Sequence, residues 1–218
     1  MKTRKLPLFG IICLVIACTH DDPSPFSHKE DYFPLKEGNT WQYTVAQTCD
    51  CSCPCASFNF GLIWFQHQFS LKTAGDSVIN DRLYRKIEYE SGDIAKMVRR
   101  DDSRYYARNT WKEEEHLFLD TSLPVGSSWV GYQNEYYRLT YTIKLKNDSR
   151  VIGGKSYKNI IVVEEAYCWT VGDECDPNSS QIVDHYFAPG AGEVYSHRPY
   201  NPLTYYSGNE NMYLVKGP

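Results

Sequence analysis

Four cysteines in one short stretch are the residues of this chain with the clearest chemical potential. They alternate with other residues in the segment Cys49-Asp50-Cys51-Ser52-Cys53-Pro54-Cys55. Thiolate sulfur is a soft ligand that suits zinc or copper(I), so this cluster is compatible with a metal site. Structural zinc sites usually use paired C-x-x-C spacings, which the segment lacks. We therefore favour disulfides, keep Cys49, Cys51, Cys53 and Cys55 as the alternative metal ligands, and predict no cofactor.

Cys18 lies where a bacterial signal peptide would be cleaved and lipidated. A start rich in Lys and Arg (residues 2–5) precedes an apolar run (6–17) that ends in Val15-Ile16-Ala17. Signal peptides join a positive region to an apolar stretch of 7–15 residues with small residues at its end. The run is too short to cross a hydrocarbon core of ~30 Å. We predict that residues 1–17 are a lipoprotein signal peptide and that Cys18 is the lipidation site.

A mature chain beginning at Cys18 resembles bacterial lipoproteins, whose first cysteine is acylated. Two or more acyl chains hold a protein on a bilayer, so the membrane is the expected partner at this end. The next residue is Thr19 rather than Asp, and by resemblance this favours the outer membrane. Asp21-Asp22 is similar to the surface-export signal of Bacteroidetes-type lipoproteins. Residues 18–30 are predicted to form a lipidated flexible tether, and both the periplasmic face and the cell surface remain open.

Six of the eight cysteines remain after Cys13 is removed with the signal and Cys18 is acylated. An even number in an exported chain favours disulfides. Cys168 and Cys175 bracket Gly172-Asp173, which could fold back as a turn and bring the two sulfurs together. Fifteen pairings are possible for six cysteines, and the sequence does not choose among them. The candidates are Cys49, Cys51, Cys53, Cys55, Cys168 and Cys175.

The composition indicates one exported domain without a basic face. Removing residues 1–17 from the 218-residue chain leaves 201 residues, which one β domain can accommodate. The net charge is −4, so nucleic acid is not an expected partner. The chain contains 18 Tyr and 5 Trp residues, which can fill a sheet core or stack on sugars and bases.

Two pairs of matching segments indicate an internal duplication. Leu35-x-x-Gly38-x-x-Trp41 recurs 88 residues later as Leu123-x-x-Gly126-x-x-Trp129. Residues 78–87 match residues 151–160, which lie 73 positions later. Residues 78–87 and 151–160 are both typical of hairpins, because Asn-Asp in the first and Gly-Gly in the second lie where a two-residue turn needs positive φ.

The two offsets differ by 15 residues, so the first copy carries an insertion of that length. The insertion falls between Trp41 and Val78, and this interval includes the four-cysteine segment. Loops tolerate insertions and often carry function. We predict one β domain over 31–218 with pseudo-repeats at about 31–118 and 119–218, and a Cys-rich loop near 49–55.

Apolar residues alternate with polar ones over 63–72 and 137–145, which is the pattern of half-buried strands. Residues 160–163 are apolar on both faces, as in a central strand. The capping-box spacing at 110–113 gives the one hint of a helix start. The predicted fold class is mainly β, an antiparallel duplicated sheet of half-barrel or barrel-like form with little helix.

The segments Tyr32-Phe33-Pro34-Leu35-Lys36-Glu37-Gly38-Asn39-Thr40-Trp41 and Tyr186-Phe187-Ala188-Pro189-Gly190-Ala191-Gly192 resemble a group of uncharacterised exported lipoproteins of Bacteroidetes-type bacteria. That group is similar to the curved half-barrel of periplasmic lipoprotein carriers, which implies a concave apolar surface. Lipocalin-like barrels are the rival resemblance, since they open with Gly-x-Trp. In this chain Gly38 and Trp41 are one residue further apart.

No recognisable catalytic motif is present. The nucleophile-elbow, zinc-protease, P-loop and dinucleotide glycine patterns are all missing from the sequence. His67 lies at an apolar strand position and is interpreted as a core histidine. His185 adjoins Asp184 in sequence without facing it, and His116 follows three glutamates in what is interpreted as a solvated acidic patch.

The sequence therefore favours an outer-membrane or cell-surface lipoprotein with a non-catalytic β-rich binding or structural module. Its ligand could be a glycan, a lipid or a partner protein. The alternatives are a surface hydrolase acting on glycans and a carrier of apolar ligands.

Overall fold

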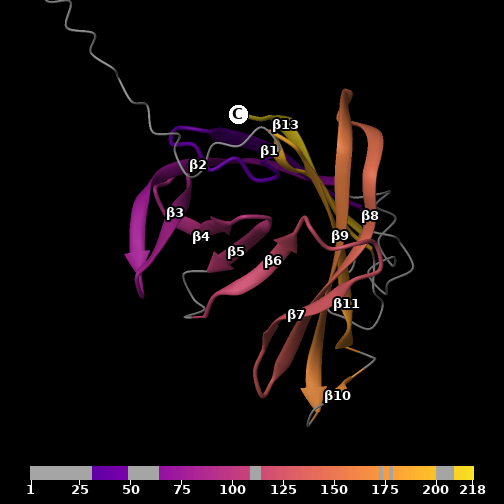
Figure 1. The fold of residues 1–218 in the computed structure, drawn as a ribbon. Coiled ribbons are helices and arrows are strands. Elements are labelled where there is room, and N and C mark those ends of the chain that lie inside the picture. Colours follow the sequence, from indigo (N-terminus) through magenta and orange to yellow (C-terminus); the bar gives the residue numbers. More distant parts are fainter. Residues whose placement is uncertain (1–30, 49–63, 109–113, 172–173, 177–178, 200–208) are drawn as a thin grey trace, which may run out of the picture.

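A computed structural model describes residues 31–48, 64–108, 114–171, 174–176, 179–199 and 209–218. Within these residues the protein is almost entirely antiparallel β structure, as predicted (Figure 1). The segment 110–113 with the capping-box spacing lies outside the described residues. The strands are β1 (Thr40–Thr48), β2 (Trp64–Ile79), β3 (Arg82–Tyr89), β4 (Ile94–Asp101), β5 (Arg104–Arg108), β6 (His116–Asp120), β7 (Ser128–Gln133), β8 (Tyr137–Ile152), β9 (Lys155–Val171), β10 (Glu174–Cys175), β11 (Gln181–Ala188), β12 (Gly192–Arg198) and β13 (Asn209–Lys216).

The strands form one curved sheet in the order β6-β5-β4-β3-β2-β1-β13-β12-β11-β9-β8-β7, with β10 added beside β9. The curvature brings β6 and β7 near each other, so the sheet is nearly closed into a barrel (Figure 1). The indole nitrogen of Trp129 on β7 donates a 2.9 Å hydrogen bond to the carbonyl oxygen of Leu117 on β6. Among the described residues no strand ladder joins β6 to β7, and this side-chain bond bridges the seam between them.

The two predicted hairpins are confirmed. Asn80 and Asp81, between β2 and β3, have φ angles of 50° and 60°. Gly153 and Gly154, between β8 and β9, have φ angles of 56° and 79°. Two-residue turns with positive φ at both positions match the right-handed twist of the flanking strands.

The turns that precede β1 and β7 share one hydrogen-bond pattern. The amide of Gly38 donates to the carbonyl oxygen of Thr73, and the amide of Thr73 donates to the carbonyl oxygen of the residue after Gly38. Gly126 and Ile143 form the same reciprocal pair. The two glycines have φ angles of 82° and 88°, which only glycine adopts at low cost. This geometry supports the predicted duplication, which remains a prediction.

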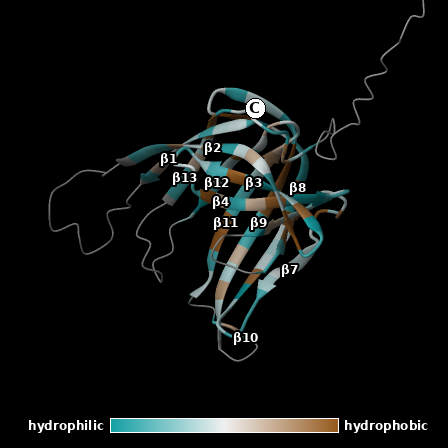
Figure 2. Ribbon diagram, turned by 90° about the vertical axis from the view of Figure 1, so that its left-hand side faces the viewer, coloured by the Kyte–Doolittle hydropathy of each residue, from teal (hydrophilic) through white to brown (hydrophobic). Residues whose placement is uncertain are grey.

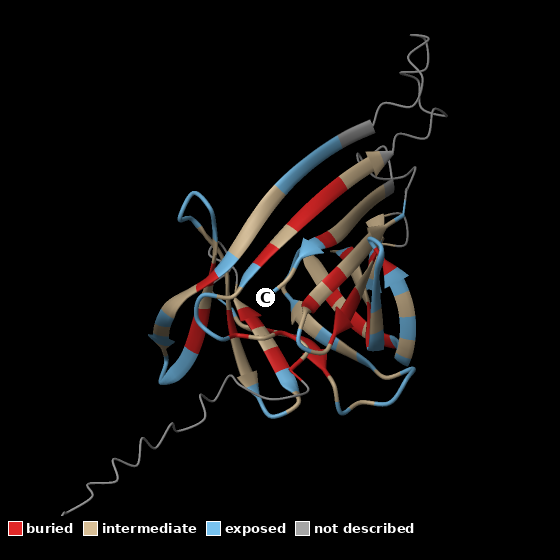
Figure 3. Ribbon diagram, turned by 90° about the horizontal axis from the view of Figure 1, so that it is seen from above, coloured by how far each residue is buried: buried red, intermediate tan, exposed pale blue. Residues whose placement is uncertain are grey.

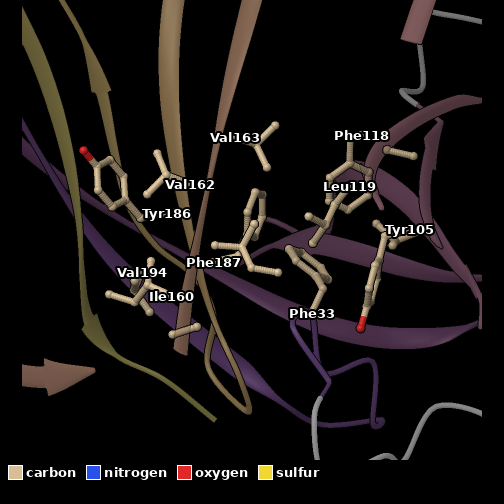
Figure 4. Packing of buried hydrophobic residues seen from close by; sticks show 14 of the residues in the cluster. Phe33, Tyr105, Phe118, Leu119, Ile160, Val162, Val163, Tyr186, Phe187 and Val194 are labelled. Carbon is tan, nitrogen blue, oxygen red and sulfur yellow. The ribbon is translucent and has the colours of Figure 1, made fainter. Parts of the chain in front are cut away.

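Aromatic residues fill the interior where the first described segment meets the β11–β12 turn. Phe33 stacks on Trp41 with ring centroids 5.6 Å apart, and Phe118 lies edge-on to Phe33. Figure 4 shows Phe33 and Phe118 among the buried residues. The indole nitrogen of Trp41 donates a 2.8 Å hydrogen bond to the carbonyl oxygen of Ala191. The segments 32–41 and 186–192 are therefore in direct contact.

The interior is not uniformly apolar. The buried residues include Asp31, Arg85, His116 and Asp120. Along the strands, buried stretches alternate with less buried ones (Figure 3) and hydrophobic stretches with hydrophilic ones (Figure 2). Within the described residues no helix is long and apolar enough to cross a membrane.

Candidate functional site

A cavity of about 180 Å³ lies inside the curved sheet and is lined mainly by charged and aromatic side chains. Seven strands contribute to it, from β4 to β12. The lining residues are Lys96, Ala107, His116, Phe118, Tyr141, Glu165, His185, Phe187 and Glu193. We take this cavity as the candidate site, because convergent ionisable groups inside a concave surface are the usual mark of a binding or catalytic site.

Strand register explains why these polar residues point inward. Tyr141 on β8 pairs with Glu165 on β9, and Glu165 pairs with Val183 on β11. His185 lies two residues after Val183 and so shares its face. Glu193 on β12 pairs with Phe187, which is two residues further along the same face. The side chains of the cavity residues thus lie on the same face of the sheet as the buried apolar side chains.

His185 is held between two carboxylates. Its Nδ1 atom lies 2.6 Å from Oε1 of Glu193, and its Nε2 atom lies 3.5 Å from Oε2 of Glu165. Burial disfavours the charged imidazolium, but the two glutamates outweigh burial and raise the pKa of His185 to about 10. The ring therefore carries a positive charge at neutral pH.

Glu165 is correspondingly stabilised as a carboxylate. Burial alone would raise its pKa, but hydrogen bonds from His185 and Tyr141 and the positive charge of His185 lower it to about 2. The side chains of Glu165, His185 and Glu193 retain 28%, 20% and 13% of their accessible surface although protein surrounds them. The remaining surface faces the cavity, so a ligand inside it can reach these groups.

Lys96 supplies a second positive charge. Its ammonium lies 4.8 Å from the centroid of the Phe33 ring and 5.6 Å from that of Phe118. Cation–π contacts of this kind stabilise a desolvated ammonium. Burial lowers the pKa of Lys96, and the negative charges of Glu193 and Glu165 partly oppose that effect.

His116 and Tyr141 form an aromatic wall of the cavity. Their rings are stacked with centroids 6.4 Å apart, and Tyr141 stacks in turn on Trp129 at 5.7 Å. Burial, followed by the charge of Glu165, raises the pKa of the Tyr141 phenol well above its usual value. Tyr141 is thus a neutral hydrogen-bond donor at any physiological pH.

These protonation states make His185 and Glu165 poor general acids or bases near neutral pH. A general base works best with a pKa near the working pH, whereas His185 stays protonated and Glu165 stays ionised near neutrality. No group of three or more metal-ligating side chains occurs among the residues that the structure describes. The arrangement is suited to holding a polar ligand through fixed charges.

A second aromatic cluster continues the same face toward β10. Tyr137 lies 5.2 Å from both Tyr132 and Tyr167, and Trp169 lies 5.8 Å from Tyr167, measured between ring centroids. Trp169 is 53% exposed. We call the residues Tyr132, Tyr137, Tyr167 and Trp169 the aromatic strip, and Trp129 and Tyr141 lie further inward on the same strands.

Two larger depressions lie elsewhere and are open to solvent. One of about 370 Å³ is bordered by Lys72, Glu90 and Lys216. Another of about 460 Å³ lies beside Arg82 and Glu115, whose side chains pair at 2.7 Å. About half of each lining is exposed. The second depression includes the buried Tyr84, whose phenol donates to Glu115, but the ionisable groups of the interior cavity converge from more strands.

The predicted cysteine sites are described in part. Cys168 and Cys175 form a disulfide with Cα atoms 5.5 Å apart, near where β10 pairs with β9. This is the local pairing considered above. The predicted lipidation site Cys18 and the four cysteines at 49–55 lie outside the described residues, as does the alternative metal site.

The histidine interpretations need correction. His116 does not belong to a solvated patch, because it is 7% exposed and lines the cavity. His67 is not a core residue, since it is exposed on β2, where it pairs with Val45 of β1. His185 does turn away from Asp184, as expected, but its place between Glu165 and Glu193 was not predicted. The sequence did indicate that His185 faces inward, because it lies two residues from both Val183 and Phe187 and so shares their apolar strand face.

Comparison with known proteins gives distant structural likenesses alone. No family model and no curated protein matches the chain. It is similar to the crystal structure of a "putative lipoprotein" from Parabacteroides distasonis, with 11% identity, a TM-score of 0.43, and coverage of 86% of this chain and 98% of that one. It is also similar to a "putative exported protein with YmcC-like fold" from Bacteroides fragilis, with 10% identity, a TM-score of 0.47, and coverage of 85% and 98%. Likenesses at this level carry no functional argument.

Proposed function

We propose that the protein is a lipid-anchored component of the outer membrane, held through Cys18, whose barrel-like body is a non-catalytic binding module. The anchor rests on the signal-peptide pattern of residues 1–17 and on the small residues before Cys18. The binding role rests on the cavity.

The place where the chain enters the body determines which end of the body lies nearer to the tether. The first described residues lie at the top of Figure 1, and β10 lies at the opposite end. The amide of Gly190 donates a 2.7 Å hydrogen bond to the carbonyl oxygen of Asp31, which fixes the entry point on the body. A protein tethered through the residues before Asp31 would present β10 and the aromatic strip away from the membrane.

The observation that carries the binding role is the His185 ion-pair cluster inside the cavity. A hydrolase needs a general acid or base whose pKa lies near the working pH, and the pKa values of His185 and Glu165 are both displaced from that range, which favours a binding role for this pair. A carrier of acyl chains would need a long apolar concavity. This cavity is small, and its lining consists of five ionisable side chains, one tyrosine and only three apolar side chains. Fixed charges that reach the cavity favour a small polar ligand.

Membrane fractionation of the Cys18→Ala variant tests the anchor. The variant should leave the membrane fraction and appear in the soluble fraction, because no thioether can form at residue 18. Cys13→Ala is the matched control, since Cys13 is expected to be removed with the signal peptide. Retention of Cys18→Ala in membranes would contradict the proposal.

Ligand-dependent stabilisation tests the binding role. A ligand that binds the folded state alone raises the melting temperature with its concentration. We expect small polar solutes from the cell envelope to raise it and long-chain fatty acids to leave it unchanged. Stabilisation by fatty acids alone would favour the carrier alternative.

A further inference from the structure

Lys96 has no hydrogen-bond acceptor of its own in the described part of the chain. Its contacts are the faces of Phe33 and Phe118, and the charges of Glu165 and Glu193 act on it without an ion pair. An ammonium carries three donors, and leaving buried donors without acceptors is costly. Lys96 is half-buried and lines the cavity, so a molecule inside the cavity can supply acceptors to its ammonium.

We infer that the cavity binds an uncharged polyhydroxyl group, such as a single sugar ring, whose hydroxyl oxygens accept hydrogen bonds from Lys96 and whose hydroxyl hydrogens are donated to Glu165 or Glu193. The inference deepens the binding role proposed above and depends on it.

The existing ion pairs of the cavity favour an uncharged ligand. The protonated His185 is paired with Glu193 and Glu165, Lys96 is influenced by the charges of the same two carboxylates, and His116 acts on Glu165 as a further positive charge. A charged ligand would compete with these pairs and leave one of the charges without its partner, which is costly where the group is buried. A hydroxyl group both donates and accepts, so it can bridge an ammonium and a carboxylate without adding charge.

The apolar lining and the volume fit a sugar ring better than a longer chain. Phe118, Phe187 and Ala107 provide apolar surface beside the charged groups, which suits a molecule with one polar edge and one apolar face. A volume of about 180 Å³ equals that of about six waters at ~30 Å³ each. It has room for one ring, and longer polymers would have to extend outside.

Calorimetric titration of the full mature chain in detergent tests this inference. The probes are glucose, galactose, mannose and N-acetylglucosamine, with glucuronate and glucosamine as charged counterparts. We expect saturable binding of at least one uncharged sugar and weaker binding of its charged counterparts. A titration in which no uncharged sugar binds, so that the cavity holds water alone, would overturn the inference.

Two variants locate the binding. Lys96→Met keeps the stem of the side chain and removes its donors, and it should weaken sugar binding by about tenfold or more. Lys144→Met is the matched control, because the exposed Lys144 pairs with Glu164 at 2.9 Å and lies outside the cavity lining. Unchanged affinity in Lys96→Met would overturn the assignment.

Ala107→Leu gives a test that keeps every charge. The larger side chain should fill part of the cavity and abolish sugar binding while circular dichroism still reports the β fold. Sugar binding that survives this substitution would also overturn the inference.

The outcomes separate this inference from the proposed function. Tighter binding of glucuronate or glucosamine than of the uncharged sugars would overturn the charge argument and leave the cavity as a binding site. Membrane release of Cys18→Ala tests the anchor independently of every sugar titration.

Discussion

His185 and Glu193 form the closer of the two ion pairs in the cavity, with Nδ1 and Oε1 2.6 Å apart. The two residues lie on β11 and β12, on either side of the Pro189–Gly192 turn. A buried imidazolium in such a pair stabilises the fold for as long as the pair is charged, so the stability of the protein should depend on pH in a defined direction.

The sign follows from the raised pKa of His185. Folding raises this pKa from 6.5 to about 10, so the pair contributes fully below pH 6.5 and loses its contribution as pH rises toward 10. Folding lowers the pKa of Glu165 from 4.5 to about 2, so its contribution is lost as pH falls from 4.5 toward 2. The cluster should stabilise the protein most between pH 4.5 and 6.5.

Urea unfolding of His185→Gln measures this dependence. We expect the substitution to reduce the free energy of unfolding by about 3 kcal/mol at pH 6, because it leaves a buried glutamate unpaired. The difference from the wild type should shrink steadily between pH 7 and 10. His67→Gln is the control, since His67 is exposed. A difference that does not change with pH would contradict the assigned charge.

Trp41→Phe should weaken the contact between the start of β1 and the β11–β12 turn. The substitution removes the hydrogen bond to Ala191 and part of a ring that is 1% exposed. We expect a loss of about 2–3 kcal/mol in the free energy of unfolding, from an unpaired carbonyl and a small void. Trp169→Phe, at an exposed position, should change it by less than ~0.5 kcal/mol. Equal effects of the two substitutions would argue against the described packing.

The local elements of this fold can be predicted from the sequence. The strands over 63–72 and 137–145 follow from alternation, and the turns at Asn80-Asp81 and Gly153-Gly154 follow from residues that tolerate positive φ. Each depends on neighbours in sequence, which is why a short pattern suffices to find them.

The cavity could not be predicted in the same way. Lys96 and Glu193 are nearly one hundred residues apart, and strand register alone determines that they face the same space. A partial signal was present, because Glu165 is in phase with Val163 and His185 is in phase with Val183. A charged residue at an apolar phase of a central strand indicates a buried site, but its partners depend on the closure of the sheet.

Introducing a glycine into one hairpin turn and removing one from the other should change the free energy of unfolding in opposite directions. Asp81 has a φ angle of 60°, so Asp81→Gly should raise the free energy of unfolding by about 0.5–1 kcal/mol. Gly154 has a φ angle of 79° and no atom near the position of an added Cβ, so Gly154→Ala should lower it by about 1 kcal/mol through the backbone alone. Thermal unfolding checks both, and effects of the same sign would contradict the turn geometry.

Removing the disulfide should loosen the end of the sheet beside the aromatic strip. Cys168 and Cys175 close a short loop, and joint replacement by serine should lower the free energy of unfolding by about 2–3 kcal/mol. Peptide mapping under non-reducing conditions should join Cys168 to Cys175 in the wild-type protein. Fragments that link either residue to the segment 49–55 would instead show that the disulfides cross between loops. The double replacement would then release two thiols in that segment, which thiol titration of the denatured variant would count.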